Sequence, residues 1–135
     1  MSAAIPEYSR VVVIGGGIIG CSVAYHLAEM GSEVVLLERD QLTSGTTWHA
    51  AGLMTTYGSG SETTLGIRKH SMELYKRLEE ETGQQTGFNP CGFIELAADD
   101  DRLEEYRRIT AFNRLHGNDI HELSPSEVAE LFPFA

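Results

Sequence analysis

The sequence predicts an α/β fold built on a parallel βαβ unit, and three patterns in the first forty residues support this. Residues 10–14 (R-V-V-V-I) form a continuous β-branched run, which is typical of a strand buried on both faces. A glycine-rich turn over residues 15–20 follows, and it leads into an apolar pattern of helical period that runs from Ile18 to Met30. A second apolar run, residues 34–37, closes at Glu38. Because strand, glycine turn, helix and strand fall within thirty residues, they define a βαβ crossover.

The middle of the chain combines a loop with a long helix. Residues 41–60 are rich in glycine, serine and threonine and predict a loop, with a short helix near residues 48–53. An amphipathic helix is predicted over residues 62–81, and Gly83 ends it. Its apolar face consists of Leu65, Met72, Tyr75 and Leu78.

Three further elements are predicted in the last third of the chain. Residues 93–97 (F-I-E-L-A) indicate a short strand that is apolar on one face. The acidic run at residues 99–101 favours the start of a helix that extends to about His116, because negative charge stabilises a helix N-terminus. The sequence S-P-S-E at residues 124–127 is a capping pattern that opens a short helix reaching Leu131.

Composition excludes several classes of protein. Ten basic and twenty acidic residues give the 135-residue chain a net charge of −10, so neither nucleic acid nor a membrane surface is an expected partner. Two distant cysteines predict neither a disulfide scaffold nor a zinc ribbon. No apolar run approaches the roughly 20 residues that span a bilayer. The spacing of His70, His116 and His121 matches no metal site, so we predict no metal.

The predicted fold is incomplete as a structural unit. A two-stranded parallel sheet leaves both of its edges open, whereas parallel sheets normally lie inside larger structures. We therefore expect the chain to be the N-terminal part of a longer protein.

The glycine turn and the acidic residue after the second strand form a dinucleotide-binding fingerprint. Gly15 permits the tight turn, Gly17 leaves room for a diphosphate, and Gly20 lets the helix pack closely on the sheet. Main-chain N–H groups near Ile18 would face the phosphates, and Glu38 would accept hydrogen bonds from a ribose. Arg39 is expected near the adenine. The alternative is a glycine turn chosen only for packing, and the fingerprint by itself leaves NAD and FAD open.

The segment after Glu38 carries a resemblance to a known family. Its string T-W-H-A-A-G-L at residues 47–53 resembles the flavin loop of the sarcosine dehydrogenase and dimethylglycine dehydrogenase family, which belongs to the D-amino-acid-oxidase-like FAD-dependent oxidoreductases. Similarity continues through L-E-E-E-T-G, G-F-I-E-L-A, D-R-L-E-E-Y and L-S-P-S-E-V-A-E-L-F-P. The resemblance implies a Rossmann-like FAD-binding βαβ unit of the glutathione-reductase-type flavoprotein fold. It also implies that residues 1–86 form the N-terminal part of the FAD-binding domain and that residues 87–135 open a substrate-binding α+β domain.

The resemblance also implies which residues contact the flavin. His49 would carry the flavin covalently, through a ring nitrogen bonded to the 8α-methyl carbon, since a neutral imidazole is a competent nucleophile. The simpler alternative is that His49 is only a polar loop residue near the cofactor. The remaining implied contacts are Gly45, Thr46, Thr47, Trp48, Ala50, Ala51, Gly52 and Leu53.

The activity implied by the resemblance is oxidative demethylation of a small N-methyl amine such as sarcosine or dimethylglycine. A hydride from the N-methyl carbon would pass to the flavin and leave an iminium, which yields a one-carbon unit at the level of formaldehyde. Relatives often add a folate-binding part, so tetrahydrofolate is a possible cofactor of the full-length protein, and an electron-transfer flavoprotein is a possible partner. Catalytic residues are expected beyond Ala135, and the expected location is intracellular, in the mitochondrial matrix of a eukaryote or the cytoplasm of a bacterium.

Three alternatives to this enzyme remain open at the level of sequence. One is a non-catalytic relative that resembles the pyruvate dehydrogenase phosphatase regulatory subunit. Another is an NAD-dependent dehydrogenase with the same glycine fingerprint. The last is a fragment of 135 residues that has no activity of its own.

Overall fold

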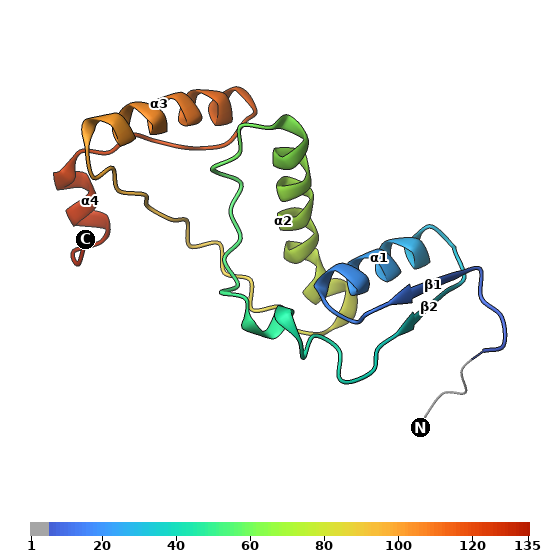
Figure 1. Cartoon of the computed structure of the whole chain (residues 1–135). Helices are drawn as coiled ribbons and strands as arrows, with labels where there is room; N and C mark the ends of the chain where they lie inside the picture. Colours follow the sequence, from blue (N-terminus) through green and yellow to red (C-terminus); the bar gives the residue numbers. More distant parts are fainter. Residues whose placement is uncertain (1–5) are drawn as a thin grey trace. The chain divides into compact units, whose positions relative to one another are not determined.

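The computed structural model describes residues 6–135, which divide into two compact units, one ending at Gly52 and one spanning Leu53–Ala135 (Figure 1). The first unit contains β1 (Val11–Ile14), α1 (Ile18–Glu29), β2 (Val34–Leu37) and the 3-10 helix η1 (Thr46–His49). The second contains α2 (Glu62–Thr82), α3 (Asp100–Leu115) and α4 (Pro125–Leu131).

The first unit is the predicted βαβ unit. β1 and β2 run parallel, in a register that pairs Val11 with Val34 and Ile14 with Leu37. α1 connects the two strands and packs against both. Its last residue is followed by Met30 at the C-cap and by Gly31 at a φ of +78°, a left-handed conformation that glycine adopts without steric cost. The prediction of a parallel α/β unit from the apolar runs and the glycine turn is confirmed.

The prediction that β1 is buried on both faces is wrong for the described chain. Val13 faces α1, and its Cγ1 lies 3.5 Å from the position of a Cβ built on Gly20. Val12 and Ile14 point to the opposite face, where they are 50% and 86% exposed. By the register, Val35 and Leu37 share this open face. The β-branched run is explained by the strand, but α1, the helix of the first unit that packs against the sheet, covers one face of it.

The helices of the second unit begin where the sequence places their caps. Ser61 accepts a hydrogen bond from the Thr64 amide at the start of α2, and Gly83 ends this helix at a φ of +69°. Asp99 caps α3 through the Arg102 amide, over 2.8 Å. Ser124 forms the predicted capping box with Glu127 at the start of α4. These ends are local in sequence, which explains why they were predictable.

The core of the second unit is small and surrounds the loop that leads into α2. Its buried apolar residues are Tyr57, Leu65 and Leu74. The Tyr57 ring contacts the rings of Phe93 and Tyr106, at centroid distances of 5.6 and 6.3 Å. Burial of the Tyr57 phenol, with the charge of Glu95 nearby, raises its pKa.

The predicted strand over residues 93–97 is absent from the described chain. These residues are extended and exposed, and no other strand pairs with them in residues 6–135. The alternating pattern identifies a segment suited to a sheet, but a strand also needs the main-chain groups of a neighbour. Phe93 keeps its contact with Tyr57, so its apolar side chain packs without a ladder.

A polar network around Asn113 holds the loop of residues 53–61 to α3. Asn113 is fully buried, and its Nδ2 group donates to the carbonyl oxygens of Ser59 and Ile109 over 3.4 and 2.9 Å. The Asn118 Nδ2 group donates to Asn113 Oδ1 over 2.9 Å. The side chain therefore uses both its donor and its acceptor.

Replacing Asn113 by aspartate is expected to lower the free energy of unfolding by about 1–3 kcal/mol, because a carboxylate cannot donate to the two carbonyls that it would face. Urea denaturation measures this change. Asn89→Asp at an exposed position is the matched control and is expected to leave the stability unchanged. Equal stability of the two variants would contradict the role of the network.

Candidate dinucleotide site

The turn between β1 and α1 has the geometry that a dinucleotide fingerprint requires. Gly15 has a φ of +103°, and its N–H donates to the Leu37 carbonyl over 2.8 Å. Gly17 is extended and occupies the N-cap position of α1 without a capping side chain. A Cβ on Gly20 would lie 1.9 Å from the Gly15 carbonyl oxygen, so α1 starts in direct contact with the turn. Two glycines of the fingerprint therefore have a structural reason here, namely the positive φ of Gly15 and the close main-chain contact of Gly20.

Glu38 is held at the turn by main-chain hydrogen bonds. Its Oε2 atom accepts from the Gly16 amide over 2.6 Å, and its Oε1 atom accepts from the Asp40 amide over 3.0 Å. These two bonds, with that to Gly16 the larger effect, lower the pKa of the Glu38 carboxyl below its ordinary value. An ionised carboxylate has about four lone-pair positions, so two remain for the hydroxyl groups of a ribose.

The lowered pKa gives a testable dependence of stability on pH. Because folding lowers the Glu38 pKa, its hydrogen bonds stabilise the fold above the unfolded value of 4.5, and this contribution is lost as pH falls through the folded value. We expect the difference in stability between the wild type and Glu38→Gln to be constant above about pH 5.5 and to shrink below pH 4.5. Glu33→Gln, at an exposed position beside β2, is the matched control variant for the loss of a carboxylate. A difference that grows on acidification would contradict the assignment.

The loop after β2 is fastened to the glycine turn at two further points. The Thr43 amide donates to the Gly16 carbonyl over 2.8 Å. Thr47 Oγ1 accepts a hydrogen bond from the Ile18 amide over 3.0 Å, across 29 positions of sequence. Thr43 has a φ of +64°, which is rare for a β-branched residue and marks a strained position in this loop.

Gly16, Leu42 and Thr43 were not identified by the sequence analysis. A Cβ on Gly16 would lie 2.5 Å from Leu42 Cδ2 and 3.1 Å from Glu38 Cβ. Both main-chain groups of Gly16 are also engaged, by Glu38 and Thr43. The sequence does contain one signal for Gly16. The fingerprint needs glycine only at positions 15 and 17, so the glycine between them is an additional one.

His49 ends η1 with one ring nitrogen fixed. Its Nδ1 atom lies 2.9 Å from the Gly45 carbonyl oxygen. A carbonyl oxygen only accepts, so this contact assigns the proton of the neutral ring to Nδ1 and leaves the Nε2 lone pair available. The ring is exposed, as is Trp48, and a hollow of about 470 Å³ beside Trp48 is lined by Leu42 and its neighbours.

The structure brings together the residues of the fingerprint with Glu38, Thr47 and their loop. Several other predicted contacts lie exposed in the first unit, namely Arg39, Gly45, Thr46, Ala50, Ala51 and Gly52. Leu53 opens the second unit and is 88% exposed. The assignment of these residues to FAD binding stays a prediction.

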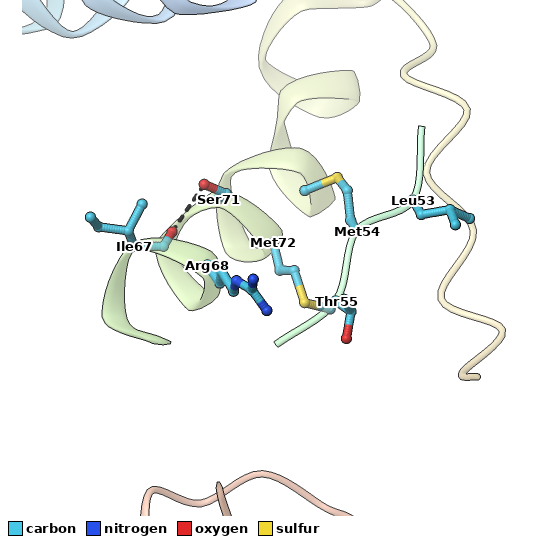
Figure 2. Close-up of a pocket in the computed structure, with 7 residues that line it drawn as sticks. All are labelled: Leu53, Met54, Thr55, Ile67, Arg68, Ser71 and Met72. Carbon is cyan, nitrogen blue, oxygen red and sulfur yellow. Dashed lines mark hydrogen bonds between the residues drawn. The ribbon is translucent and has the colours of Figure 1, made fainter. Parts of the chain in front are cut away.

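A second hollow, of about 270 Å³, lies within the second unit (Figure 2). Its apolar lining consists of Leu53, Met54, Ile67 and Met72, and Figure 2 shows Met54 extending from the loop toward α2 and Met72 extending from α2 toward Thr55. Arg68, the charged residue of the lining, donates to the Tyr57 carbonyl. This bond anchors the loop to α2 and gives the arginine a structural role.

The described residues contain neither a metal cluster nor a membrane-spanning helix. Among residues 6–135, no three His, Cys, Asp or Glu side chains come together as metal ligands. None of the helices in this range combines the length and apolarity needed to cross a bilayer.

A parallel βαβ unit with a glycine turn, a helix starting on that turn and an oriented carboxylate after the second strand defines a dinucleotide-binding protein. Residues 10–135 match the family model described as "FAD dependent oxidoreductase" (DAO). The chain belongs to this family of FAD-dependent oxidoreductases. The choice between NAD and FAD, which the fingerprint left open, is therefore FAD.

Individual relatives agree with the family. The chain is 44% identical to human mitochondrial sarcosine dehydrogenase over 134 residues, and 45% identical to rat mitochondrial dimethylglycine dehydrogenase over 132 residues. These matches cover 98% and 95% of the chain but only 14% and 15% of the two relatives. The mouse pyruvate dehydrogenase phosphatase regulatory subunit is 43% identical over 133 residues, with 98% of the chain and 15% of that protein covered.

A solved structure supports the same fold. L-proline dehydrogenase from P. horikoshii aligns with a TM-score of 0.86 and 32% identity, over 96% of this chain and 34% of that one. The resemblance to the family and the α/β flavoprotein fold predicted from the sequence are both confirmed.

Proposed function

We propose that the chain is the FAD-binding N-terminal region of an enzyme that oxidatively demethylates sarcosine, dimethylglycine or a related small N-methyl amine. The observation that carries this proposal is that the loop bearing His49 is hydrogen-bonded to the glycine turn through Thr43 and Thr47. The substrate class is supported by the identity to the two N-methyl amino acid dehydrogenases. Residues 1–86 are assigned to the FAD domain and residues 87–135 to the start of the substrate domain.

The residues of the turn fit the diphosphate and ribose of FAD. Gly17 has no side chain, and a Cβ there would lie 3.3 Å from Thr47 Oγ1, so the glycine leaves a cradle beside the start of α1. The positive end of the α1 dipole favours a phosphate at this position. Glu38 offers two lone-pair positions to the ribose, and its negative charge disfavours a 2′-phosphate.

His49 is proposed to hold the flavin covalently through Nε2. In the neutral ring, the Nδ1–H group donates to the Gly45 carbonyl oxygen, which leaves the Nε2 lone pair to form the bond to the flavin. FAD, when bound, would supply the electrophilic 8α-methyl carbon and would accept the electron pair released when the C–N bond forms, with dioxygen as the terminal oxidant. The covalent bond would fix the flavin ring system to η1, the 3-10 turn that carries His49.

Other features of the whole protein are proposed from the relatives. Tetrahydrofolate would accept the one-carbon unit in a later domain, and an electron-transfer flavoprotein would accept the electrons. Human sarcosine dehydrogenase and rat dimethylglycine dehydrogenase are mitochondrial proteins, so we propose the mitochondrial matrix for a eukaryotic source and the cytoplasm for a bacterial one. The isolated chain of 135 residues is proposed to be inactive, because it spans about 14% of the sarcosine dehydrogenase.

Anaerobic mixing with substrate tests the proposed activity. The protein expressed from its complete gene is purified with its flavin and titrated with sarcosine and, separately, with dimethylglycine. We expect the flavin absorbance to bleach with at least one of them and formaldehyde to appear in equal amount when folate is absent. Glycine, which has no N-methyl group, is the control and should leave the flavin oxidised.

A non-catalytic regulatory protein is the second candidate, and the 43% identity to the mouse regulatory subunit favours it. The anaerobic titration with sarcosine and dimethylglycine distinguishes the enzyme from the regulatory protein. Flavin that no N-methyl amine reduces, together with stable binding to a phosphatase subunit, would replace the enzyme proposal with the regulatory one.

A further inference from the structure

α1 begins without a cap of its own. The N-cap residues of α2, α3 and α4 each accept a main-chain N–H bond with their own side chains, Ser61, Asp99 and Ser124. Gly17 has no side chain, and α1 has no side-chain cap from it. The first amides of a helix have no partner within the helix, so α1 needs an acceptor from elsewhere.

Thr47 supplies that acceptor from the flavin loop. Its Oγ1 atom lies 3.0 Å from the Ile18 amide nitrogen, at the first residue of α1. The absence of a side chain at Gly17 eases this approach, since a Cβ there would lie in tight contact, 3.3 Å from the same Oγ1 atom. Thr47 itself is half-buried, whereas its neighbours Thr46 and Trp48 are exposed. The helix thus receives from a distant loop the hydroxyl that it lacks locally.

We propose that Thr47 is a positioning residue, which caps α1 and thereby fixes the loop that carries His49 against the glycine turn before the flavin is attached. Thr47 and His49 lie in the same single turn of 3-10 helix, η1. The main-chain bond from Thr43 to Gly16 fixes the preceding part of the loop to the same turn. The hydroxyl that accepts from Ile18 still has its own proton to donate, so capping is compatible with contact to a phosphate oxygen. The effect of Thr47 on flavin attachment rests on the proposed covalent bond at His49, whereas the capping of α1 by Thr47 does not.

Three variants separate the cap from other effects of the residue. Thr47→Val keeps the shape and removes the acceptor, and Thr47→Ser keeps the acceptor and removes the methyl group. Thr63→Val, at an exposed position of α2, is the matched control for replacing a threonine hydroxyl by a methyl group. All are made in the protein expressed from its complete gene and purified without flavin.

The first readout is hydrogen exchange at the start of α1 in the flavin-free protein. Thr47→Val is expected to exchange the Ile18 amide about fivefold faster, the change that corresponds to a lost cap of about 1 kcal/mol. Thr47→Ser and Thr63→Val are expected to exchange like the wild type. Unchanged exchange in Thr47→Val would overturn the proposal, as would an equal increase in Thr47→Ser.

The second readout is the rate at which added FAD becomes resistant to acid precipitation. Thr47→Val is expected to slow this step at least about fivefold, with recovery in Thr47→Ser. An unchanged rate in Thr47→Val, with exchange at Ile18 accelerated, would overturn the positioning role. A wild type that never binds flavin covalently would instead refute the proposed linkage, while the exchange experiment would still decide whether Thr47 caps α1.

Discussion

Replacing Gly20 by alanine is expected to destabilise the first unit by about 3 kcal/mol or more and to abolish FAD binding. The added Cβ would lie 1.9 Å from the Gly15 carbonyl oxygen and 3.1 Å from the Gly15 carbonyl carbon. Both atoms belong to the main chain, so the clash is relieved only if the turn and the start of α1 move apart. That movement displaces the amides on which the diphosphate is proposed to lie. Urea denaturation and the flavin content after purification measure the two effects.

Gly66→Ala is the matched control for this substitution. Gly66 also lies within an α-helix, α2, but a Cβ there meets no atom within 4 Å. Since alanine has the higher helix propensity, Gly66→Ala is expected to stabilise the protein by about 0.5–1 kcal/mol and to keep its flavin. If Gly20→Ala were as stable as Gly66→Ala and retained flavin, the close contact of α1 with the turn would be refuted.

Replacing His49 by alanine is expected to eliminate covalently bound flavin altogether. The yellow colour should precipitate with the wild-type protein in acid and remain in the supernatant with the variant. Noncovalent FAD should still bind before acid is added, because the glycine turn and Glu38 do not depend on the imidazole. The measurement is flavin absorbance in the pellet and in the supernatant.

His121→Ala serves as the control for the loss of a histidine. His121 is exposed and pairs with Asp119 over 2.8 Å in the second unit. This variant is expected to give a yellow pellet like the wild type. A yellow pellet from His49→Ala would assign the covalent bond to another residue and would leave His49 as a polar residue of the loop.

The parts of the fold that the sequence predicted are those set by local interactions. Both strands of the βαβ unit follow from short apolar runs, and the end of α2 follows from the left-handed Gly83. The capping box at Ser124 depends on residues three positions apart. In each case the residues that decide the structure lie within one or two turns of one another, so their pattern is visible in the sequence.

The parts that could not be predicted depend on partners far away in the chain. The bond from Ile18 to Thr47 joins residues 29 positions apart, and that from Asn113 to Ser59 joins residues 54 apart. Nothing in the local composition of either segment specifies the other. The segment of residues 93–97 shows the converse, because its pattern suits a strand while the described chain provides no strand beside it. Val12 and Ile14 are exposed for a similar reason. A β-branched run predicts a strand, but it does not predict which elements pack on the two faces of that strand.

Peptide mapping of the wild-type protein tests whether His49 carries the flavin covalently. Cleavage after Arg39 and Arg68 releases residues 40–68, which contain His49 as their only histidine and no cysteine. We predict that this peptide carries the added mass of one FAD less two hydrogen atoms, because the new bond replaces one N–H and one C–H bond, and that fragmentation assigns the added mass to His49. Recovery of the same peptide without added mass, from protein whose flavin had been bound at the start, would contradict it.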